Sequence, residues 1–214
     1  MSAALSVATI VATVVLVEGR INARSEPLVQ KRVEFLKDWS RSIAPTGTPL
    51  GDTGRIVKIG IFTDFQCPFC KRMDSVLTML ETKYPNAIAR TVVHFPIQGH
   101  QFAKPAAIAF ECAAQQGRAA QMHGVLYAEQ QQFGKSPWSD FARKAKVLDV
   151  NRFDACVSQD SSNARIEAGI ALGTKLAISG TPAVVVNGWL FDPAFPEAIE
   201  KAVGNVARGK TLKP

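Results

Sequence analysis

The chain has 214 residues, of which 47% are hydrophobic, enough for one substantial core and an inserted subdomain. Its 12 Phe and 3 Trp argue for a packed protein and against a disordered one. The net charge of +7 arises from 25 basic and 18 acidic residues, and the basic residues are scattered with no long run. That distribution argues against nucleic-acid binding, so we expect no nucleic-acid partner.

An uncharged apolar stretch, LSVATIVATVVLV, occupies residues 5–17. It is shorter than the roughly 18 residues that cross a bilayer comfortably, but it fits a short anchor or the apolar core of a signal peptide. A buried strand or helix is the alternative. Because no cleavage site is convincing, the sequence favours a retained anchor over a cleaved signal. We assign residues 1–20 to this membrane anchor or signal segment.

Residues 21–50 are expected to form a linker and an amphipathic helix that leads in from the anchor. The helix is predicted over 27–43, where apolar residues recur at helical spacing. Those residues are Val29, Val33, Leu36, Trp39 and Ile43. Residues 44–54 are rich in Pro and Gly and predict a loop, with one short edge strand near Leu50.

Residues 51–101, the first half of the predicted core, carry the pattern of a β–α–β unit. The β-branched run RIVKIGIF at 55–62 predicts a strand, and IARTVVHF at 88–95 predicts a second one. Between them, Lys71–Tyr84 has one apolar face and predicts a helix. Such a unit builds a pair of parallel strands.

Residues 102–178 lack strand signals and are rich in Ala, Gln and helical apolar spacings. They predict four or five short helices, with Pro105 in the first turn of one helix and Ser161 or Ser162 as the cap of another. We expect this stretch to form an inserted α-helical subdomain.

Residues 179–207, the second half of the core, return to strand and helix. The run AVVVNGWLF predicts a hairpin that turns at Asn187-Gly188, and a last helix is expected over 195–207. Residues 208–214 form a polar tail. The order of elements is that of an α/β thioredoxin fold with a mixed central sheet, in which helices are inserted between the two halves.

The Cys67-Pro68-Phe69-Cys70 motif follows a predicted strand and starts a predicted helix. A sulfur at a helix N-terminus faces unpaired backbone N–H groups and the positive end of the helix dipole, and both stabilise a thiolate. The spacing places Cys70 one turn further on, close enough for a disulfide with Cys67, and Pro68 suits the first turn of a helix. The pattern predicts a redox pair in which Cys67 is the exposed attacking thiol and Cys70 the sheltered resolving thiol.

Three other interpretations of these cysteines are weaker. A structural zinc site needs four ligands at set spacings, and His94, His100 and His123 form no such pattern. A cysteine hydrolase would need a histidine near Cys67, for which His94 at the end of a predicted strand is the candidate. Two incidental thiols do not account for the strand before them and the helix after them. We expect neither a metal nor a cofactor.

Pro182 opens a predicted strand directly after Thr181. A proline that opens a strand beside an active site can be cis, and an ordinary trans proline at a strand entry is the alternative. In a cis loop, the backbone groups of Thr181 would be free to pair with a substrate peptide as an additional strand. We therefore place Thr181 and Pro182, together with Pro68 and Phe69, in the environment of the active site.

The motif DFQCPFC between strand and helix, together with HFPIQGHQFAKPAAIAFECAAQQG, MHGVLYAEQ and GTPAVVVNG, resembles the DsbA-like thiol:disulfide oxidoreductases of bacterial envelopes. The resemblance covers residues 50–205 and is strongest at CPFC and at the Thr-Pro and hairpin stretch. It implies a thioredoxin fold with a helical insertion, a Cys67–Cys70 redox pair, a cis Pro182 and an extracytoplasmic location. The Pro-Phe dipeptide between the cysteines departs from the Pro-His of the best-known enterobacterial oxidase, which leaves the redox potential open.

Cys112 and Cys156 lie on predicted helices of the insertion, within ECAAQQ and FDACVS. Three interpretations apply: a structural disulfide that staples the helical block, a second redox pair, or two buried free thiols. The staple is the favoured interpretation, and the resemblance is compatible with such an extra bridge.

The sequence predicts an oxidase that introduces disulfides into exported proteins, with unfolded or reduced proteins as substrates. Phe65 and Phe69 are expected to expose an apolar patch around Cys67 that receives them. As the resemblance implies, reoxidation would come from a membrane quinone-linked partner of the DsbB or vitamin-K-epoxide-reductase type. We expect a monomer in the periplasm or cell envelope, anchored by the N-terminal segment or exported.

Two alternatives for the function stay open. A reductase or disulfide isomerase could use the same scaffold, because the reduction potential sets the direction of exchange and the sequence does not give it. A non-catalytic thioredoxin-like peptide-binding module or chaperone is the alternative from another class. The intact C-x-x-C motif argues against that last alternative.

Overall fold

The computed structural model describes residues 32–159 and 164–212 of the chain. The apolar segment assigned to residues 1–20 and the helix cap predicted at Ser161 or Ser162 lie outside these residues. Among the helices that are described, none is both long enough and apolar enough to cross a membrane.

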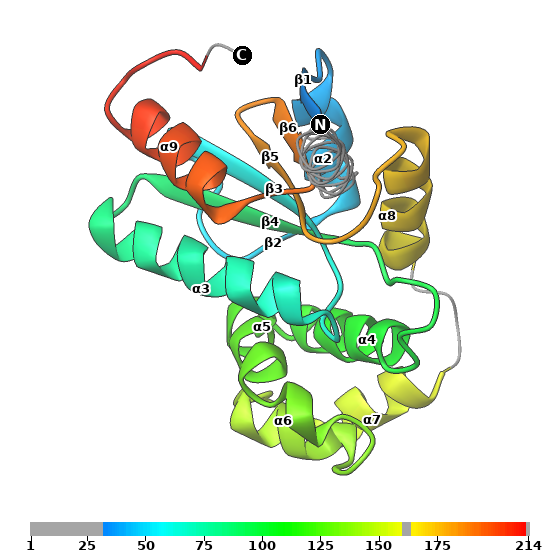
Figure 1. Cartoon of the computed structure of the whole chain (residues 1–214). Helices are drawn as coiled ribbons and strands as arrows, with labels where there is room; N and C mark the ends of the chain where they lie inside the picture. Colours follow the sequence, from blue (N-terminus) through cyan, green and yellow to red (C-terminus); the bar gives the residue numbers. More distant parts are fainter. Residues whose placement is uncertain (1–31, 160–163, 213–214) are drawn as a thin grey trace, which may run out of the picture. The chain divides into compact units, whose positions relative to one another are not determined.

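A six-stranded mixed sheet forms the centre of the described part of the chain (Figure 1). Its strands are β1 (Arg32–Phe35), β2 (Thr48–Pro49), β3 (Val57–Thr63), β4 (Ile88–His94), β5 (Ala183–Val186) and β6 (Trp189–Asp192). They lie in the order β1-β6-β5-β3-β4-β2, and β3 and β4 are parallel while the other neighbouring pairs are antiparallel. This mixed sheet confirms the predicted fold class.

The central strand β3 brings the two halves of the core together. Its sequence VKIGIFT is buried at every position except Lys58, as expected for a strand that is covered on both faces. Phe62 pairs with Val93 of β4 on one side and with Ala183 of β5 on the other. Because β3 and β5 are antiparallel, the segment that follows Thr63 lies beside the segment that precedes Ala183.

Helices cover both faces of this sheet. α3 (Pro68–Lys83) and α9 (Pro196–Ala207) pack on one face, and α2 (Trp39–Thr46) and α8 (Ala164–Lys175) pack on the other. The first face is held by a core that includes Leu77, Leu80, Val184, Ile199 and Val203. The second is held by Ile43, Phe62, Val93, Val185 and Leu190. The loop between β3 and α3, residues 64–67, is called the redox loop below because it contains Cys67. It therefore rests on a sheet that is covered on both sides.

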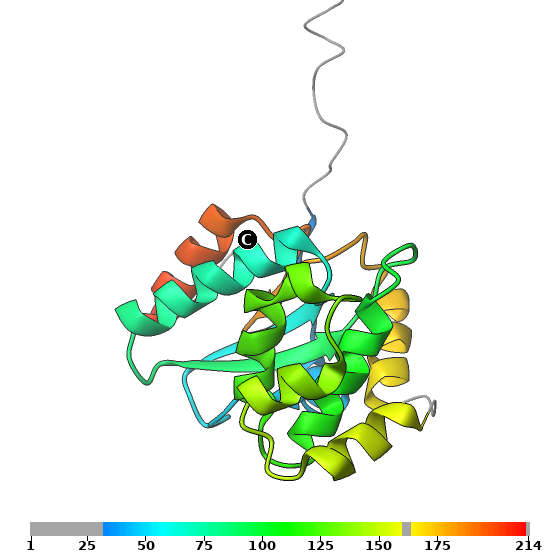
Figure 2. The same cartoon turned by 90° about the horizontal axis from the view of Figure 1, so that it is seen from below.

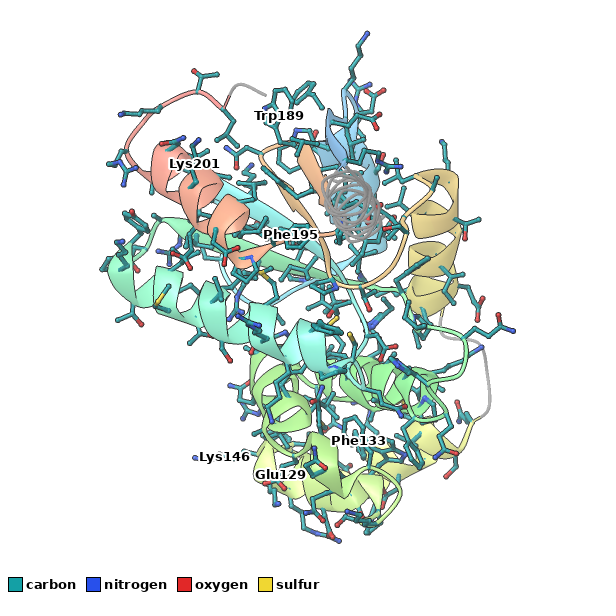
Figure 3. The ribbon with its side chains drawn as sticks, in the orientation of Figure 1. Glu129, Phe133, Lys146, Trp189, Phe195 and Lys201 are labelled. Carbon is teal, nitrogen blue, oxygen red and sulfur yellow. A yellow bond between two sulfur atoms is a disulfide. The ribbon has the colours of Figure 1, made fainter. Side chains whose placement is uncertain are left out.

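Four further helices form the inserted block: α4 (Ala103–Ala114), α5 (Ala119–Ala128), α6 (Trp138–Lys144) and α7 (Val150–Ser158), with a 3-10 turn, η1 (Gln130–Gln132), after α5. Figure 2 shows them in front of the sheet. Rings pack in this block at centroid distances of 5.1–5.6 Å, among them Phe133, Trp138 and Phe141; Phe133 is labelled in Figure 3. With α8, the block supplies the helices predicted between β4 and β5.

The hairpin of β5 and β6 turns at Asn187-Gly188, as predicted. Both residues have positive φ angles, 44° and 92°, as a two-residue hairpin turn of this kind requires. Gly188 is needed for space as well, because a Cβ atom there would lie 2.6 Å from Trp39 and 2.7 Å from Phe35. The Asn187 side chain accepts a hydrogen bond from the backbone N–H of Lys58, which ties the turn to β3.

The helix predicted over 27–43 is wrong for residues 32–35, which form strand β1. β1 pairs antiparallel with β6, and the ring of Phe35 packs on that of Trp189 with centroids 5.3 Å apart. The four residues alternate polar and apolar side chains, so they suit a sheet edge as well as a helix face. Pairing with β6 favours the strand over the helix for these four residues, and helix α2 starts only after β1.

Candidate active site

Cys67 occupies the N-cap position of α3, directly ahead of Pro68 at the start of the helix. β3 ends at Thr63, and the turn that follows is closed by a hydrogen bond from the backbone N–H of Cys67 to the carbonyl oxygen of Asp64 at 3.1 Å. The Cys67 sulfur therefore faces the unpaired N–H groups of the first helical turn and the positive end of the helix dipole.

The two thiols of the motif differ in acidity. The hydrogen bond from the Cys70 thiol, aided by the backbone N–H groups of Cys70 and Phe69, lowers the pKa of Cys67 to about 6, against the opposing effect of burial. Burial raises the pKa of Cys70 well above its usual range, and the nearby Cys67 raises it further. Near neutral pH, Cys67 is therefore the thiolate and Cys70 the thiol, which suits Cys67 to attack and Cys70 to resolve.

The surroundings of Cys67 differ from the sequence prediction in two respects. Cys67 was expected to be exposed, but it is only 4% exposed, because the Thr181 loop lies against its sulfur. Phe65 was expected in an exposed patch, but it turns inward and is 1% exposed. Phe69 is 67% exposed. Of the two phenylalanines, Phe69 alone therefore offers apolar surface beside the redox pair.

A second loop closes the site. The Thr181–Pro182 peptide bond is cis, and the carbonyl oxygen of Thr181 lies 3.5 Å from the Cys67 sulfur, where it can accept a hydrogen bond when Cys67 is protonated. Asp192, which is 2% exposed, holds the loop by accepting hydrogen bonds from the backbone N–H of Ser179 at 2.9 Å and from its hydroxyl at 2.6 Å. The structure thus brings together two segments that lie far apart in the sequence.

Asp64 supports the redox loop and was not singled out in the sequence. Its buried carboxylate accepts hydrogen bonds from the backbone N–H groups of Gln66 at 2.7 Å and Ile97 at 2.9 Å, and lies 2.7 Å from His100 Nδ1. An Asp directly after a strand is a signal for such a turn, because its side chain can bond the backbone two residues on. Asp64 therefore fixes the path of the chain into Cys67.

Gln130 is a second supporting residue that the sequence did not reveal. From η1 in the helical block, its Nε2 atom donates to the carbonyl oxygens of Phe65 at 2.6 Å and Cys67 at 3.2 Å. No local pattern marks this glutamine, since it lies in a run of three Gln residues far from the motif. The bonds attach the redox loop to the insertion.

Comparison with known proteins identifies the family. The family model described as Thioredoxin matches residues 44–205. The chain belongs to the thioredoxin family. A crystal structure of a thioredoxin-like oxidoreductase from Silicibacter pomeroyi DSS-3 is 27% identical, with a TM-score of 0.64, and the match covers 82% of this chain and 99% of that one. The oxidoreductase DsbA from Xylella fastidiosa has the same fold at 21% identity, with a TM-score of 0.58 over 77% and 91% of the two chains. The predicted DsbA-like fold is thereby confirmed.

Two curated relatives differ in how much of their length this thioredoxin-family chain covers. The Na(+)/H(+) antiporter NhaA 1 of Salinispora arenicola is 30% identical over 192 residues, which are 89% of this chain and 28% of the relative. The chain therefore spans only about a quarter of the antiporters that it matches. The probable disulfide bond formation protein D of Bacillus anthracis is 26% identical over 171 residues, which are 74% of this chain and 77% of the relative.

A disulfide joins Cys112 of α4 to Cys156 of α7 in this thioredoxin-family protein. Their Cα atoms lie 5.9 Å apart, and the two residues are separated by 44 positions. Cys67 and Cys70 are the free cysteines. The bonded pair belongs to the core of the insertion, where a closed loop stabilises the folded state by restricting the unfolded chain.

Phe65 lies beneath the redox loop in a cluster of rings. Its neighbours, with ring centroids 5.1–6.1 Å away, are Phe110, Tyr127, His123 and His94. Burial lowers the pKa of His123 to about 3, so this imidazole is neutral, and His94 Nε2 is bonded to Glu111 at 2.8 Å. These histidines therefore serve as packing beneath the loop.

Across the described residues, no group of three or more His, Cys, Asp or Glu is placed to hold a metal ion.

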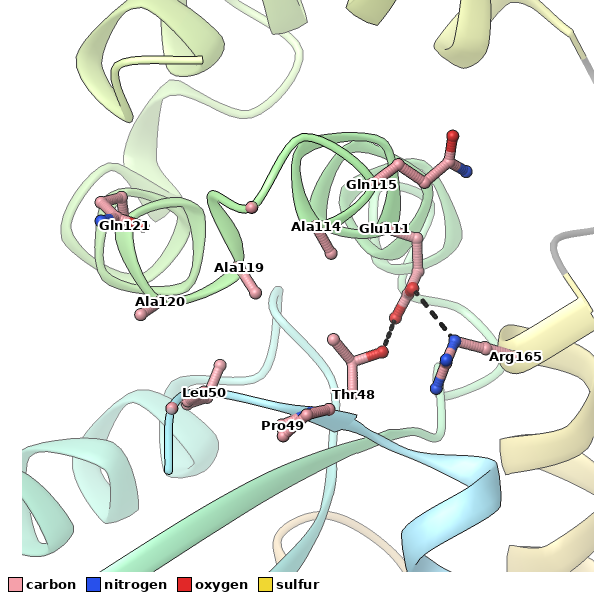
Figure 4. Close-up of a pocket in the computed structure, with 12 residues that line it drawn as sticks. Thr48, Pro49, Leu50, Glu111, Ala114, Gln115, Ala119, Ala120, Gln121 and Arg165 are labelled. Atoms are coloured by element: carbon pink, nitrogen blue, oxygen red, sulfur yellow. Dashed lines mark hydrogen bonds and ion pairs between the residues drawn. The ribbon is translucent and has the colours of Figure 1, made fainter. Parts of the chain in front are cut away.

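A cavity of about 500 Å³ lies between β2 and the helices α4 and α5 (Figure 4). The buried Glu111 carboxylate lines it and accepts a hydrogen bond from the Thr48 hydroxyl at 2.6 Å, and its other oxygen lies 3.9 Å from Arg165 Nε. These polar groups satisfy one another, and the lining includes neither redox cysteine nor the Thr181 loop. We therefore assign the chemistry to the redox pair and not to this cavity.

Proposed function

We propose that this protein is an extracytoplasmic thiol:disulfide oxidoreductase that oxidises cysteine pairs in exported proteins through Cys67 and Cys70. The observation that carries the proposal is the contrast between the two sulfurs. The pKa of Cys67 is lowered to about 6, whereas burial raises the pKa of Cys70. A pair with this contrast exchanges disulfides through Cys67 and holds Cys70 for the intramolecular step.

In the oxidising direction, the reaction begins with the Cys67–Cys70 disulfide. A substrate thiolate attacks Sγ of Cys67, the bond between the two cysteines breaks, and Cys70 leaves with the electron pair and then takes up a proton. A second substrate thiolate attacks the first substrate sulfur, which completes the substrate disulfide and releases Cys67 as a thiolate. Two electrons have then passed from the substrate to the pair, and the low pKa of Cys67 makes it a good leaving group.

The acidity of Cys67 supports oxidation as the preferred direction. Stabilising its thiolate stabilises the reduced form, and a pair with a stabilised reduced form is more oxidising. A pKa of about 6 lies below the value of about 7 found in thioredoxin and above the value of about 3.5 found in DsbA. Relative to an ordinary cysteine, the lowered pKa of Cys67 supports the oxidising direction.

The surface around Cys67 supports a substrate with an extended apolar segment next to its cysteine. Phe69 is 67% exposed and lies between the two sulfurs in sequence. The Thr181 carbonyl lies 3.5 Å from the Cys67 sulfur at the entry to β5, so a peptide that adds along this backbone would present its cysteine to Cys67. Unfolded or reduced proteins offer segments of this kind.

A location outside the cytoplasm is supported by two observations. The Cys112–Cys156 disulfide is of a type that persists in oxidising compartments, and a relative is named as a probable disulfide bond formation protein. We propose that the apolar stretch at 5–17 anchors or exports the protein, which acts as a monomer. The reduced pair needs an electron acceptor, for which we propose a membrane quinone-linked partner of the DsbB or vitamin-K-epoxide-reductase type.

The reduction potential of the Cys67–Cys70 pair tests this function. The purified protein is equilibrated in glutathione buffers of graded ratio, and the fraction of oxidised pair is measured by alkylation and mass spectrometry. We expect a potential well above the value of about −270 mV found in thioredoxin. A potential close to that value would overturn the oxidase assignment in favour of a reductase. Cys70→Ser protein, which cannot close the pair, is the control.

A further inference from the structure

The buried carboxylate of Asp192 holds the Thr181 loop, residues 176–182, which joins α8 to β5. Asp192 is the last residue of β6 and is 2% exposed. One of its oxygens accepts a hydrogen bond from the Ser179 hydroxyl at 2.6 Å, and the other accepts one from the Ser179 backbone N–H at 2.9 Å. Both bonds end on a residue two positions before Thr181, so they fix the path of the chain into the site.

The segment that contains this aspartate, residues 192–194, also holds the loop on the other side of Thr181. The backbone N–H of Ala194 donates a hydrogen bond to the carbonyl oxygen of Pro182 at 3.0 Å. The Thr181 carbonyl therefore lies between two points at which the chain is attached to the same segment. Its distance of 3.5 Å from the Cys67 sulfur depends on both attachments.

Arg32 of β1 supports this arrangement from the edge of the sheet. It pairs with Asp192 in the register of β1 and β6, and its Nη2 atom lies 3.9 Å from the Asp192 carboxylate. The guanidinium also donates to the carbonyl oxygens of Leu176 at 2.6 Å and Ala177 at 3.2 Å, at the start of the Thr181 loop. Because a buried carboxylate needs hydrogen bonds and an opposite charge nearby, Arg32 stabilises the charge of Asp192 as well as the loop.

The Thr181 carbonyl needs a second donor during the exchange. A protonated Cys67 can donate to this oxygen, whereas a disulfide or a mixed disulfide at Cys67 has no proton to give. The oxygen is partly buried, so losing its donor costs free energy. A backbone N–H of a substrate peptide, next to the substrate cysteine, can take the place of the thiol proton.

We propose that Asp192, together with Arg32, is a positioning residue that holds the Thr181 carbonyl where it accepts a hydrogen bond from the backbone N–H of a peptide substrate. The inference rests on the proposed function, because it concerns the same exchange. That exchange is unchanged: a substrate thiolate attacks Sγ of Cys67, the disulfide breaks, and Cys70 leaves with the electron pair. Extended peptides gain the additional hydrogen bond, whereas small thiols without an amide react without it.

The test compares two thiols that open the Cys67–Cys70 disulfide, with rapid quenching by an alkylating agent. One is 2-mercaptoethanol, which has no amide, and the other is a short peptide with one cysteine between apolar residues. Asp192→Asn keeps the shape of the side chain, but an amide accepts through one oxygen, so at least one bond to Ser179 is lost. We expect the peptide rate constant to fall about 5-fold, as for one lost hydrogen bond, and the 2-mercaptoethanol rate constant to stay native.

A modified peptide tests the hydrogen bond itself. An ester in place of an amide beside the cysteine removes the N–H donor with little change in shape, and the amides on the two sides are replaced one at a time. With the native protein, one of these esters is expected to react about 5-fold more slowly than the parent peptide. With Asp192→Asn, the same ester is expected to react at nearly the rate of the parent peptide, because the Thr181 carbonyl has moved. A loss of packing alone would leave the ester effect at its native size.

Two further variants separate positioning from stability. Arg32→Met removes the guanidinium and keeps an apolar stem, and we expect the same peptide-specific loss as in Asp192→Asn. The loss is expected to be smaller, because the Arg32 side chain is 33% exposed. Phe153→Leu, in the core of the insertion, is the matched control. It is expected to lower the stability of the fold while both thiols keep their native ratio of rate constants.

Three results would overturn the inference: a native peptide rate constant in Asp192→Asn, equal slowing with both thiols, or an ester effect that Asp192→Asn leaves unchanged. If Asp192→Asn does not fold, as judged by circular dichroism, Ser179→Ala decides the question in the same assays, because it removes the hydroxyl donor to Asp192. A native disulfide that neither thiol opens would overturn the proposed function as well. Normal exchange in which no ester differs from the parent peptide overturns the role of Asp192 alone.

Discussion

The Cys67 sulfur lies 3.5 Å from the carbonyl oxygen of Thr181, a residue 114 positions further along the chain. The antiparallel pairing of β3 with β5 produces this contact, because it sets the end of one strand beside the start of the other. The helical block can therefore be inserted between the two strands without separating the halves of the site. The reacting sulfur and the backbone that can receive a substrate are both held by buried central strands.

The reduced protein is expected to be alkylated at Cys67 with a half-maximal rate near pH 6. The hydrogen bond from the Cys70 thiol is the largest cause of the lowered pKa of Cys67. Cys70→Ala is therefore expected to move the midpoint upward toward the ordinary cysteine value, whereas Cys70→Ser keeps a hydroxyl donor and is expected to move it less. Iodoacetamide labelling followed by mass spectrometry measures all three midpoints. An unchanged midpoint in Cys70→Ala would contradict the assigned cause.

The stability of the reduced protein, relative to the oxidised one, is expected to rise with pH. The pKa of Cys67 is about 6 in the folded state against 9.0 in the unfolded state. A lowered pKa gives stability that is present above the unfolded value and lost as the pH falls through the folded value, so the gain builds up between pH 6 and pH 9.

Cys70 sets the upper end of this window. Its pKa is raised in the folded state, so above the ordinary thiol value its unfolded form ionises first and the stability declines. Urea midpoints of reduced and oxidised protein at about pH 5 and about pH 8 check the prediction. Other groups titrate in both redox states and largely cancel in the difference. A difference that is the same at both pH values would be at odds with the lowered pKa of Cys67.

Gln130→Ala is expected to lower stability by about 1–3 kcal/mol and to raise the pKa of Cys67. The change removes both hydrogen bonds that Gln130 Nε2 donates to the redox loop, and it leaves the carbonyl oxygens of Phe65 and Cys67 without this partner. A looser loop holds the Cys67 sulfur less firmly against the backbone N–H groups that favour its thiolate. Gln131→Ala removes an exposed glutamine from the same 3-10 turn and is expected to change neither quantity. Equal effects in the two variants would exclude a specific role for Gln130.

The redox pair could be predicted from the sequence because its chemistry is local. A strand, a C-x-x-C motif and a helix are neighbours along the chain, and the helix N-terminus follows from Pro68. The hairpin could be predicted for the same reason, since its turn depends on two adjacent residues. Asn187 and Gly188 adopt the positive φ angles that their residue types favour.

The supporting residues could not be predicted because they act across the fold. Gln130 reaches the redox loop only once the insertion has packed against it. Phe65 turns inward for the same reason, since its neighbours Phe110 and Tyr127 lie on inserted helices. Strand β1 owes its conformation to β6, a partner that lies at the other end of the sequence. Patterns within a short window contain no information about such partners.

Removing the Cys112–Cys156 disulfide is expected to cost stability without changing the redox pair. For two residues separated by 44 positions, the loss of unfolded-state restriction corresponds to about 4 kcal/mol at 25 °C in the chain-entropy treatment. A Cys112→Ala/Cys156→Ala protein, compared with the native protein by urea unfolding, measures this loss. Its Cys67–Cys70 potential is expected to stay native, because the bond joins α4 to α7 inside the insertion. A shifted potential would instead indicate that the two pairs communicate.

Gly169→Ala is expected to destabilise the protein by about 1–3 kcal/mol, although alanine favours helices over glycine. In the middle of α8, a Cβ atom at this position would collide with the carbonyl oxygen of His94 and lie 3.0 Å from its backbone nitrogen. Backbone atoms of β4 cannot rotate away, so α8 must move off the sheet. Gly124→Ala is the matched control, since Gly124 lies inside α5 with nothing within 4 Å of its Cβ position. That control is expected to gain about 0.5–1 kcal/mol from helix propensity, and urea unfolding measures both variants. If Gly169→Ala were stabilising as well, the close packing of α8 on β4 would be wrong.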